Sequence, residues 1–350
     1  MKVVFLYTEL AGYIVNCFNE LAKARNIVHV FYWEINAEAP FEFDLVDGVI
    51  LYSRKKYNHK ADLLEAVRCI DPDKIICSGW VDSVYLKICS YYKTKIPTIL
   101  ALDNQWNGNI KQLLGVFIAR YFLTSKFSHA WVPGSKQYRY AEKLGFDSAY
   151  IQKGFYTANV ELFRNFYLQN KISKEQNFPK VILYVGRYVK HKGIYDLWRA
   201  FIEVTEEKFS DWELWCVGTG EEFENRIIHN SIKHFGFLQP KEMNDVISKS
   251  GVYILPSHFE PWGVTLQEFA LSGLPLLVSD KVGSSEVFLE ENINGYTFKS
   301  GDISSIKTSL KKIFAMEQSS LIKFQKASSE IGNKINVDLW VSAIMEFKNV

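Results

Sequence analysis

The sequence lacks a long apolar run, and no stretch approaches the roughly 20 apolar residues that a membrane-spanning helix needs. The N-terminal stretch MKVVFLY is short and is followed by Glu9. It has neither a long apolar core nor a small-residue cleavage site, so it does not have the pattern of a signal peptide. These absences lead us to expect a cytoplasmic protein.

Cysteine and histidine are too few and too scattered to predict a metal site. The five cysteines form no C-x-x-C pair, and the seven histidines show no H-x-x-x-H spacing. The single D-x-D, Asp71-Pro72-Asp73, falls between a predicted helix and a predicted strand, where a turn is a better interpretation than a Mg²⁺ or Mn²⁺ site. We therefore expect no bound metal and no disulfide, with the cysteines packed as small apolar residues. They are Cys17, Cys69, Cys77, Cys89 and Cys216.

Net charge is also small. The formal value of +2 argues against general nucleic-acid binding. No complete G-x-G-x-x-G follows a predicted strand, because GTGEEF at 218–223 has only its beginning, and this argues against a nicotinamide cofactor. The charge is nevertheless uneven, since residues 48–147 carry fifteen Lys and Arg against eight Asp and Glu. Two interpretations stay open: an ordinary solvated surface, or a face of an N-terminal domain that rests on anionic lipid headgroups at the inner side of the plasma membrane.

Short apolar runs alternate with amphipathic stretches along the chain. This alternation predicts an α/β protein with parallel, doubly wound sheets, which bind ligands outside the carboxyl ends of their strands. The predicted strands are 3–7, 28–33, 47–53, 74–79, 98–102, 129–134, 181–186, 213–218, 232–237, 252–257 and 274–279, and the predicted helices are 12–24, 59–70, 194–208, 240–249, 264–271 and 337–348.

At 350 residues, 48% of them apolar, the chain exceeds the size at which single cores stop growing, so we expect two domains. The polar run 168–180 predicts a linker between them. The expected division is an N-terminal domain over 1–168 with the last helix at about 335–350, and a C-terminal domain over 169–334.

Two carboxylates, Glu260 and Glu268, stand eight residues apart around Gly263. The first is predicted in a loop at a helix start and the second inside the helix. At about 1.5 Å per residue they are on the order of 12 Å apart, whereas paired carboxylates that cleave a glycosidic bond sit roughly 5–10 Å apart. Two interpretations are open: the pair can be ordinary surface glutamates, or the two carboxylates can bind the two ends of an elongated ligand. The free N–H groups at the helix start suit an anion, so the ligand class indicated is a nucleotide sugar.

The stretch GRYVKHKG at 186–193 carries two cations in a loop after a predicted strand. Gly186 ends the strand, Arg187 and Lys192 lie in the loop, and Gly193 precedes the next helix. A forked guanidinium and an ammonium are suited to a diphosphate, although basic residues in a loop can also be ordinary surface.

Together these residues resemble the donor site of retaining glycosyltransferases of the GT-B fold, in family four, also called glycosyl transferases group 1. The likeness starts at the E-x7-E of Glu260 and Glu268 and runs through Gly273, Pro275, Gly283 and the NGYTF turn at 294–298. It is strong in the second half of the chain and weak in the first. It implies two Rossmann-like domains that face a cleft, with the last helix crossing back to the N-terminal domain.

The resemblance also implies roles for individual residues. Arg187 and Lys192 would hold the donor diphosphate, Glu260 the transferred sugar and Glu268 the ribose hydroxyls. The remaining donor-binding candidates are Gly12, Gly186, Phe237, Trp262, Gly263, Val264 and Thr265.

Two of the candidates lie in the first half. Gly12 follows the first strand, where relatives usually have two glycines and this chain has one. Asp103 follows the strand 98–102, where a carboxylate could orient or deprotonate an acceptor hydroxyl, or could simply cap a turn.

The function expected from this resemblance is a metal-independent, retaining transfer of a sugar from a UDP- or GDP-linked donor. The acceptor would be a glycan or lipid-linked glycan, in bacterial surface polysaccharide synthesis. No cofactor besides the donor and no nucleic acid partner is expected. Two alternatives stay open: a catalytically silent subunit that holds a donor or scaffolds a partner, and a GT-B sugar-nucleotide epimerase.

Overall fold

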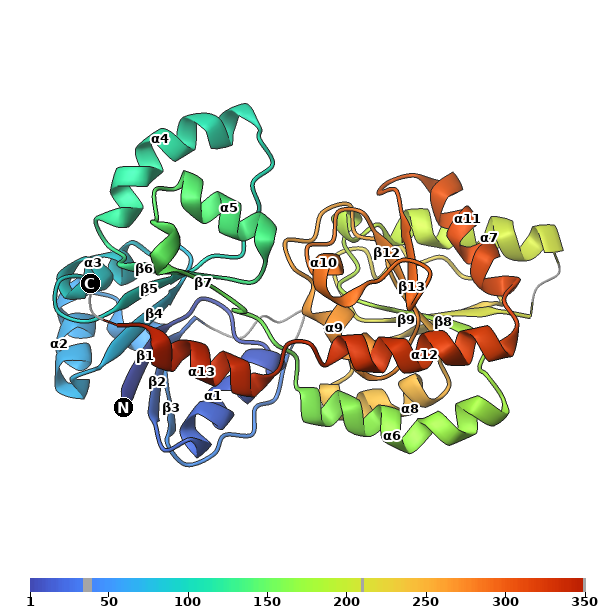
Figure 1. Ribbon diagram of the computed structural model, residues 1–350, viewed down its shortest axis with the longest axis horizontal. Helices are drawn as coiled ribbons and strands as arrows, with labels where there is room; N and C mark the ends of the chain where they lie inside the picture. The colour runs from blue at the N-terminus through green and yellow to red at the C-terminus, as the bar shows by residue number, and fades with distance from the viewer. Residues whose placement is uncertain (34–39, 209–210, 349–350) are drawn as a thin grey trace. The chain divides into compact units, whose positions relative to one another are not determined.

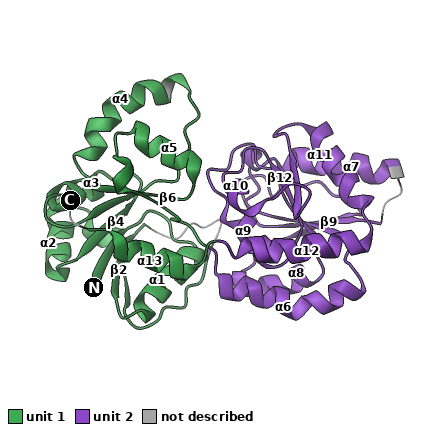
Figure 2. Cartoon of the chain, viewed as in Figure 1, with its two compact units in different colours: residues 1–36, 41–157, 335–350 green, residues 37–40, 158–334 purple. Residues whose placement is uncertain are grey.

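The computed structural model describes residues 1–33, 40–208 and 211–348. The chain divides into two compact units (Figure 2). Unit 1 comprises residues 1–36, 41–157 and 335–350, and unit 2 comprises residues 37–40 and 158–334. Each unit is described here by itself.

Unit 1 is built on a sheet of seven parallel strands in the order β3-β2-β1-β4-β5-β6-β7 (Figure 1). The strands are β1 (Lys2–Leu6), β2 (Ile27–Tyr32), β3 (Val49–Ser53), β4 (Lys74–Ser78), β5 (Thr98–Ala101), β6 (His129–Val132) and β7 (Ile151–Lys153). The helices are α1 (Gly12–Lys23), α2 (Lys60–Ile70), α3 (Ser83–Tyr92), α4 (Ile110–Thr124), α5 (Ser135–Lys143) and α13 (Val337–Glu346), with 3₁₀ turns η1 (Arg54–Tyr57) and η2 (Ser148–Tyr150).

Unit 2 repeats this architecture with six parallel strands in the order β10-β9-β8-β11-β12-β13. The strands are β8 (Val181–Val185), β9 (Glu213–Val217), β10 (Ile232–Phe235), β11 (Val252–Leu255), β12 (Leu276–Ser279) and β13 (Gly295–Phe298). The helices are α6 (Val160–Gln176), α7 (Ile194–Lys208), α8 (Asn244–Ser248), α9 (Val264–Leu271), α10 (Ser285–Phe288), α11 (Ile303–Phe314) and α12 (Gln318–Gly332), with 3₁₀ turns η3 (Lys190–Lys192) and η4 (Pro240–Met243).

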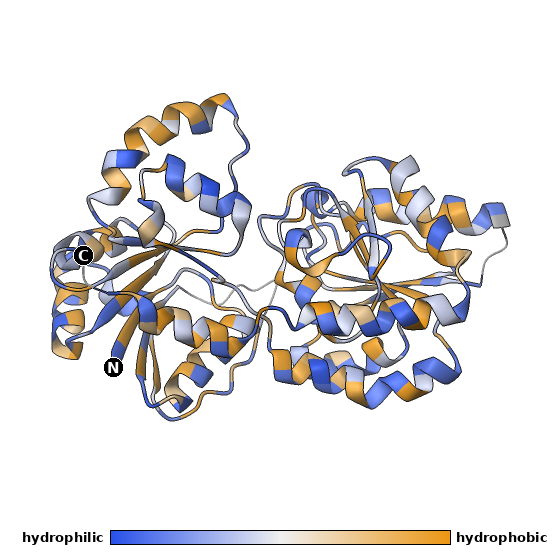
Figure 3. Cartoon of the chain, in the orientation of Figure 1, coloured by the Kyte–Doolittle hydropathy of each residue, from blue (hydrophilic) through white to orange (hydrophobic). Residues whose placement is uncertain are grey.

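The central strands are almost fully buried because helices cover both faces of each sheet, as expected for parallel sheets. Strands coloured as hydrophobic run through the middle of both units in Figure 3. The predicted α/β class and the two doubly wound sheets are therefore confirmed.

The C-terminal helix α13 packs on unit 1, as the resemblance implied. The Trp340 side chain is fully buried and its Nε1 donates to the Phe155 carbonyl at 2.7 Å. Its ring stacks on Phe5 at 6.1 Å and lies 5.0 Å from Trp131. The last helix thus completes the core on one face of the first sheet.

The predicted linker at 168–180 is wrong. Most of this run is the second half of α6, whose Phe163 and Phe166 are buried against unit 2. The Lys174 side chain in this run is buried although it is charged, and its ammonium donates to the Ser250 carbonyl at 2.8 Å. The division of the chain falls between 157 and 158, because α6 packs with α8 and α9.

Three smaller expectations also have an outcome. The NGYTF stretch is a strand, β13, and only Asn294 before it forms a turn, where its amide donates to the Phe288 carbonyl at 2.9 Å. The D-x-D is a turn as predicted: Asp71 ends α2 with φ of 55°, and the Asp73 carboxylate accepts from the Lys2 N–H at 2.7 Å. Four cysteines are buried, but Cys69 is exposed on α2.

Within the ranges that the structure describes, no helix is both long enough and apolar enough to cross a bilayer.

Candidate donor site

The sheet of unit 2 has one point where the strand order reverses. From β8 the chain moves through β9 and β10 in one direction, and it then returns to place β11 and β12 on the other side. β8 and β11 are neighbours, with Leu183 paired to Tyr253. The two loops that follow β8 and β11 lie at the carboxyl ends of these strands, the place where doubly wound sheets bind ligands. These loops are 186–193, after β8, and 256–263, after β11.

The loop 186–193 is held in place by hydrogen bonds between its backbone groups and neighbouring residues. The Tyr184 hydroxyl donates to the Arg187 carbonyl at 2.9 Å, and the Tyr188 N–H donates to the Thr219 carbonyl at 2.8 Å. Gly193 has φ of 70°, and a Cβ added there would lie 2.2 Å from the Pro256 carbonyl oxygen. Only glycine lets the loop come this close to the strand end after β11.

The two loops are joined by an ion pair between the Lys192 Nζ and the Glu260 carboxylate. Both side chains are largely buried, with 17% and 14% of their surface exposed. The Ser257 hydroxyl donates to the same Glu260 oxygen at 3.1 Å. The residue predicted to bind the diphosphate, Lys192, is therefore in contact with the residue predicted to bind the sugar, Glu260. In a nucleotide sugar the diphosphate and the sugar are adjacent, so their binding residues are expected to be neighbours. The Arg187 side chain is exposed in the same loop.

The loop 256–263 is held against the turn after β12. The Glu260 N–H donates to the Lys281 carbonyl at 3.1 Å, and the Gly283 N–H donates to the Glu260 carbonyl at 3.0 Å. Gly263 begins α9 with φ of 89°, and a Cβ there would lie 2.9 Å from the Cγ of Glu260. This glycine thus allows Glu260 to lie beside the helix start.

Helix α9 presents its first turn and Glu268 on the partly exposed side. The Thr265 Oγ1 accepts from the buried Tyr253 hydroxyl at 2.9 Å, which fixes the helix on β11. Part of Glu268 reaches solvent, but the dense protein around its carboxyl raises the pKa of Glu268 to about 7 through desolvation. Among the described residues, no side chain donates a hydrogen bond to this carboxylate. A vicinal diol could supply the missing donors.

The structure brings most of the predicted donor residues to one edge of unit 2. Trp262 differs from the expectation for a ligand-binding side chain, because its ring is 98% buried near Phe288 and can contribute to a site only through its backbone. Phe237 follows β10 at the same edge and is half-buried. The residues that gather at this edge are Gly186, Arg187, Lys192, Phe237, Glu260, Trp262, Gly263, Val264, Thr265 and Glu268.

Gly12 and Asp103 belong to unit 1, at the carboxyl ends of its own strands. The reversal point there lies between β1 and β4, where the Thr8 N–H donates to the Ser78 hydroxyl oxygen at 3.0 Å. Gly12 is the first residue of α1 after this point. Asp103 follows β5 and accepts from the Tyr156 hydroxyl at 3.2 Å, and burial holds the pKa of Tyr156 well above its usual range.

Two features of the candidate donor site in unit 2 were not predicted from the sequence. Ser257 supports Glu260, and His258 Nε2 lies 2.6 Å from an Asp196 carboxylate oxygen on α7. The only sequence signal was their place directly after a predicted strand. In residues 1–33, 40–208 and 211–348, no group of three or more His, Cys, Asp or Glu side chains could hold a metal ion.

The chain is similar to known proteins in part of its sequence and, over nearly its full length, in its fold. Residues 168–333 match the family model of the glycosyl transferases group 1. A lipopolysaccharide 1,6-galactosyltransferase of Escherichia coli K12 is 26% identical over 217 residues, 58% of this chain and 59% of that protein. A 2-deoxystreptamine N-acetyl-D-glucosaminyltransferase of Niallia circulans is 28% identical over 154 residues, 41% of this chain and 38% of that protein. The matched segments thus span less than two thirds of these curated relatives.

Solved structures match over nearly the full length. HepE of Anabaena, solved in complex with UDP and glucose, has a TM-score of 0.73 at 15% identity and covers 99% of this chain and 98% of its own. A sucrose-phosphate synthase from Thermosynechococcus elongatus has a TM-score of 0.72 at 16% identity, with the same coverage.

Two parallel doubly wound units, with a cation-bearing loop and a glycine-led helix start at one reversal point, define the GT-B fold of glycosyltransferases. Over residues 168–333, the sequence of this chain is similar to the glycosyl transferases group 1.

The first prediction concerns the close approach at Gly193. A Gly193→Ala variant should lose about 1–3 kcal/mol more unfolding free energy than Gly301→Ala, because its methyl group meets the Pro256 carbonyl. Gly301 is a matched control with nearly the same φ, 69°, and no atom within 4 Å of an added Cβ. Urea unfolding of both variants measures the difference, and equal losses would contradict the argument.

The second prediction concerns the pH dependence caused by Glu268. Its raised pKa means that the folded chain keeps a proton, between about pH 4.5 and 7, that the unfolded chain releases. Stability from this group is therefore present at low pH and is lost as pH rises through 7. Glu268→Gln removes the ionisation, so its unfolding free energy relative to the wild type should be higher at pH 8 than at pH 5.

The control for this measurement is Ser319→Ala, a substitution at an exposed position of α12 that changes no titratable group, so its difference from the wild type should be the same at both pH values. Urea midpoints at pH 5 and pH 8 provide the comparison. A Glu268→Gln difference that does not change with pH would count against the buried, ionisable carboxyl.

Proposed function

We propose that this chain is a retaining, metal-independent glycosyltransferase that moves a sugar from a nucleotide-diphosphate sugar to a glycan or lipid-linked glycan. The single observation that carries the proposal is the contact of Lys192 with Glu260 at the reversal point of unit 2. In the proposal, Lys192 binds the diphosphate and Glu260 binds the sugar, and their contact supports this because the two groups are adjacent in a nucleotide sugar. Arg187 shares the loop of Lys192, and Glu268 lies on the helix that begins beside Glu260.

The proposed chemistry needs negative charge to be stabilised on the leaving diphosphate. As the bond between the anomeric carbon and the phosphate oxygen breaks, its electron pair moves to that oxygen. Arg187 and Lys192 stabilise this charge, together with the N–H groups at the start of α9 near Gly263 and Thr265. Preorganised donors of this kind take the place that a metal ion has in other transferases.

The acceptor hydroxyl attacks the anomeric carbon from the face that the diphosphate leaves, so that the configuration is retained. Its proton passes to the leaving phosphate oxygen, and Asp103 is proposed to orient the hydroxyl. Glu260 holds hydroxyls of the transferred sugar, and Glu268 holds the ribose diol through its two oxygens. No covalent intermediate with the protein is needed.

The relatives support the choice of substrates. HepE is solved with UDP and glucose, and the Escherichia coli relative is named as a lipopolysaccharide galactosyltransferase. We infer a UDP- or GDP-linked donor and an acceptor that belongs to surface polysaccharide synthesis. Cytoplasmic residence, with peripheral contact at the inner face of the plasma membrane, follows from such an acceptor and is part of the proposal.

The experiment that tests this function is a thermal-shift panel of UDP-, GDP- and ADP-sugars, followed by transfer assays with the donor that binds. A ligand that binds only the folded state at about 100 times its Kd should raise the midpoint on the order of 5 °C. One donor should shift the midpoint and be consumed. Binding without transfer or hydrolysis would favour a silent donor-binding subunit, and conversion of the free sugar nucleotide would favour an epimerase.

A variant of Arg187 tests the proposed charge stabilisation. Arg187→Ala should lower turnover by a factor on the order of 10²–10³, as removal of one preorganised donor does. Lys190→Ala is the control in the same loop, since this lysine is 81% exposed and pairs with Glu222 at 3.7 Å. Steady-state kinetics should show a large loss for Arg187→Ala and little change for Lys190→Ala. Near-normal turnover of Arg187→Ala would remove the residue from this role.

A further inference from the structure

Helix α4 of unit 1 turns its large apolar side chains outward. Each of the seven is between 44% and 77% exposed, and Phe117 is the most exposed of them. They are Ile110, Leu113, Leu114, Phe117, Ile118, Tyr121 and Phe122. In Figure 3 the ribbon of α4 is coloured as hydrophobic over much of its length. We call these seven residues the α4 apolar face.

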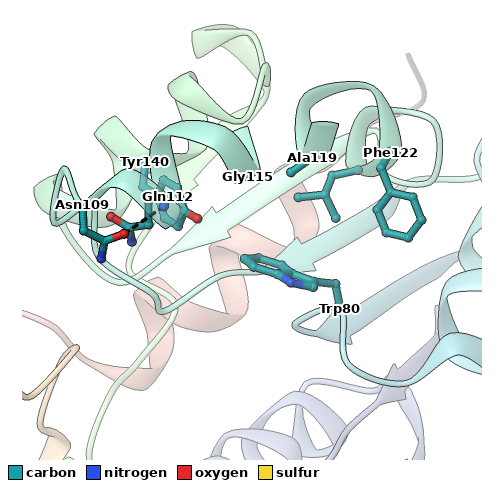
Figure 4. A pocket seen from close by; sticks show the side chains of 8 residues that line it. Trp80, Asn109, Gln112, Gly115, Ala119, Phe122 and Tyr140 are labelled. Carbon is teal, nitrogen blue, oxygen red and sulfur yellow. Dashed lines mark hydrogen bonds between the residues drawn. The ribbon is translucent and has the colours of Figure 1, made fainter. Parts of the chain in front are cut away.

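The inward side of α4 carries fewer large apolar residues: Leu123 belongs to the core of unit 1, and Val116 and Ala119 pack against it. Gln112, Gly115 and Ala119 line a cavity of about 300 Å³ between the helix and Trp80, and Phe122, the least exposed of the seven, also lines it (Figure 4). Among the residues of α4 whose burial the structure describes, Leu123 alone is fully buried, at 1% exposure. A helix of a soluble protein normally has its large apolar residues on the inward side, so α4 is inverted. Its composition is therefore not explained by packing within unit 1.

An exposed apolar patch of this size marks a surface that another partner covers. No described element of unit 1 packs extensively along α4. The helix has 15 residues and is about 22 Å long, too short to span a bilayer but of ordinary length for a helix that lies in the membrane interface. Tyr121, Phe117 and Phe122 are aromatic residues of the kind that favour this interface.

The charge around α4 is complementary to one kind of surface. Residues 104–141 contain no Asp or Glu, and they contain five cations, Lys111, Arg120, Lys126, Lys136 and Arg139. The Lys126 Nζ lies 3.7 Å from the centre of the Phe122 ring, so a cation adjoins the α4 apolar face directly. A surface with apolar side chains and an excess of cations fits an anionic lipid bilayer. It fits a second copy of the same face poorly, because like charges would meet across the symmetry axis.

We propose that α4 is an interfacial helix that docks this protein on an anionic lipid bilayer, with the α4 apolar face inserted at the boundary between headgroups and acyl chains. The inference deepens the proposed function and rests on it for the purpose of docking, which is access to a lipid-linked acceptor. It assigns membrane contact to one helix, whereas the charge excess over 48–147 indicated only a broad region.

The test is co-sedimentation of the full chain with vesicles, without any nucleotide sugar present. The wild type should bind vesicles of phosphatidylcholine with phosphatidylglycerol and bind phosphatidylcholine vesicles much more weakly. Phe117→Gln combined with Ile118→Gln should lower the partition coefficient about tenfold or more. Both side chains are more than 70% exposed, so the fold should not change.

The matched control replaces two exposed isoleucines of unit 2, Ile172→Gln with Ile228→Gln, which are 62% and 82% exposed. This control should bind vesicles like the wild type. Arg120→Gln with Arg139→Gln should reduce binding to the anionic vesicles only. Wild-type binding by the Phe117 and Ile118 variant would overturn the proposal. So would a wild-type dimer that binds no vesicles and is dissociated by these two substitutions.

Failure of docking and failure of the proposed function are distinguishable. Vesicle binding is measured without donor, and the thermal-shift panel is measured without lipid. A chain that binds a sugar nucleotide but no vesicles overturns only the docking proposal. A chain that binds vesicles through α4 but binds no sugar nucleotide supports the docking proposal and contradicts the proposed function.

Discussion

The parallel pairing of β8 with β11, at the point where strand order reverses, is the constraint on which the candidate site depends. Neighbouring parallel strands end at the same edge, so the loops that follow them begin side by side although they are about 70 residues apart in sequence. The Lys192–Glu260 ion pair joins these loops, and the contact of Gly193 with the Pro256 carbonyl sets how closely they approach. These two contacts between the loops add to the hydrogen bonds that hold each loop against its own surroundings.

Buried hydroxyl groups give the same edge its rigidity. Tyr184 and Tyr253 are fully buried and donate to the Arg187 carbonyl and to Thr265 Oγ1. Each tyrosine fills the core with its ring and holds a loop or helix start with its hydroxyl. The ring of Tyr253 also stacks on Phe269 of α9, with centroids 4.3 Å apart. The hydrophobic core and the positions of the site residues are thus coupled through single side chains.

Much of the fold and of the candidate site could be predicted from the sequence because the signals were local. Alternating strands and helices, the spacing of Glu260 and Glu268, and the cations at Arg187 and Lys192 all lie within short windows. The predicted linker was wrong because the run 168–180 starts after the buried Phe163 and Phe166 of α6 and contains mainly the polar second half of that helix. The contact of Lys192 with Glu260 and the raised pKa of Glu268 depend on tertiary packing, which no local pattern contains. The orientation of α4 could not be predicted either, since apolar residues around much of a helix do not show which side meets the sheet.

The position of α13 has a consequence for the order in which the chain can complete itself during synthesis. Trp340 lies between Phe5 and Trp131, yet it leaves the ribosome only after all of unit 2 has been made. Unit 2 has every strand and helix of its core in one continuous stretch from α6 to α12 and can finish folding first. The N-terminal sheet, although translated earlier, lacks the core contacts of Trp340 and the hydrogen bond to the Phe155 carbonyl until the last helix is made. Unit 1, most of which is translated first, is therefore the unit that completes its folding last.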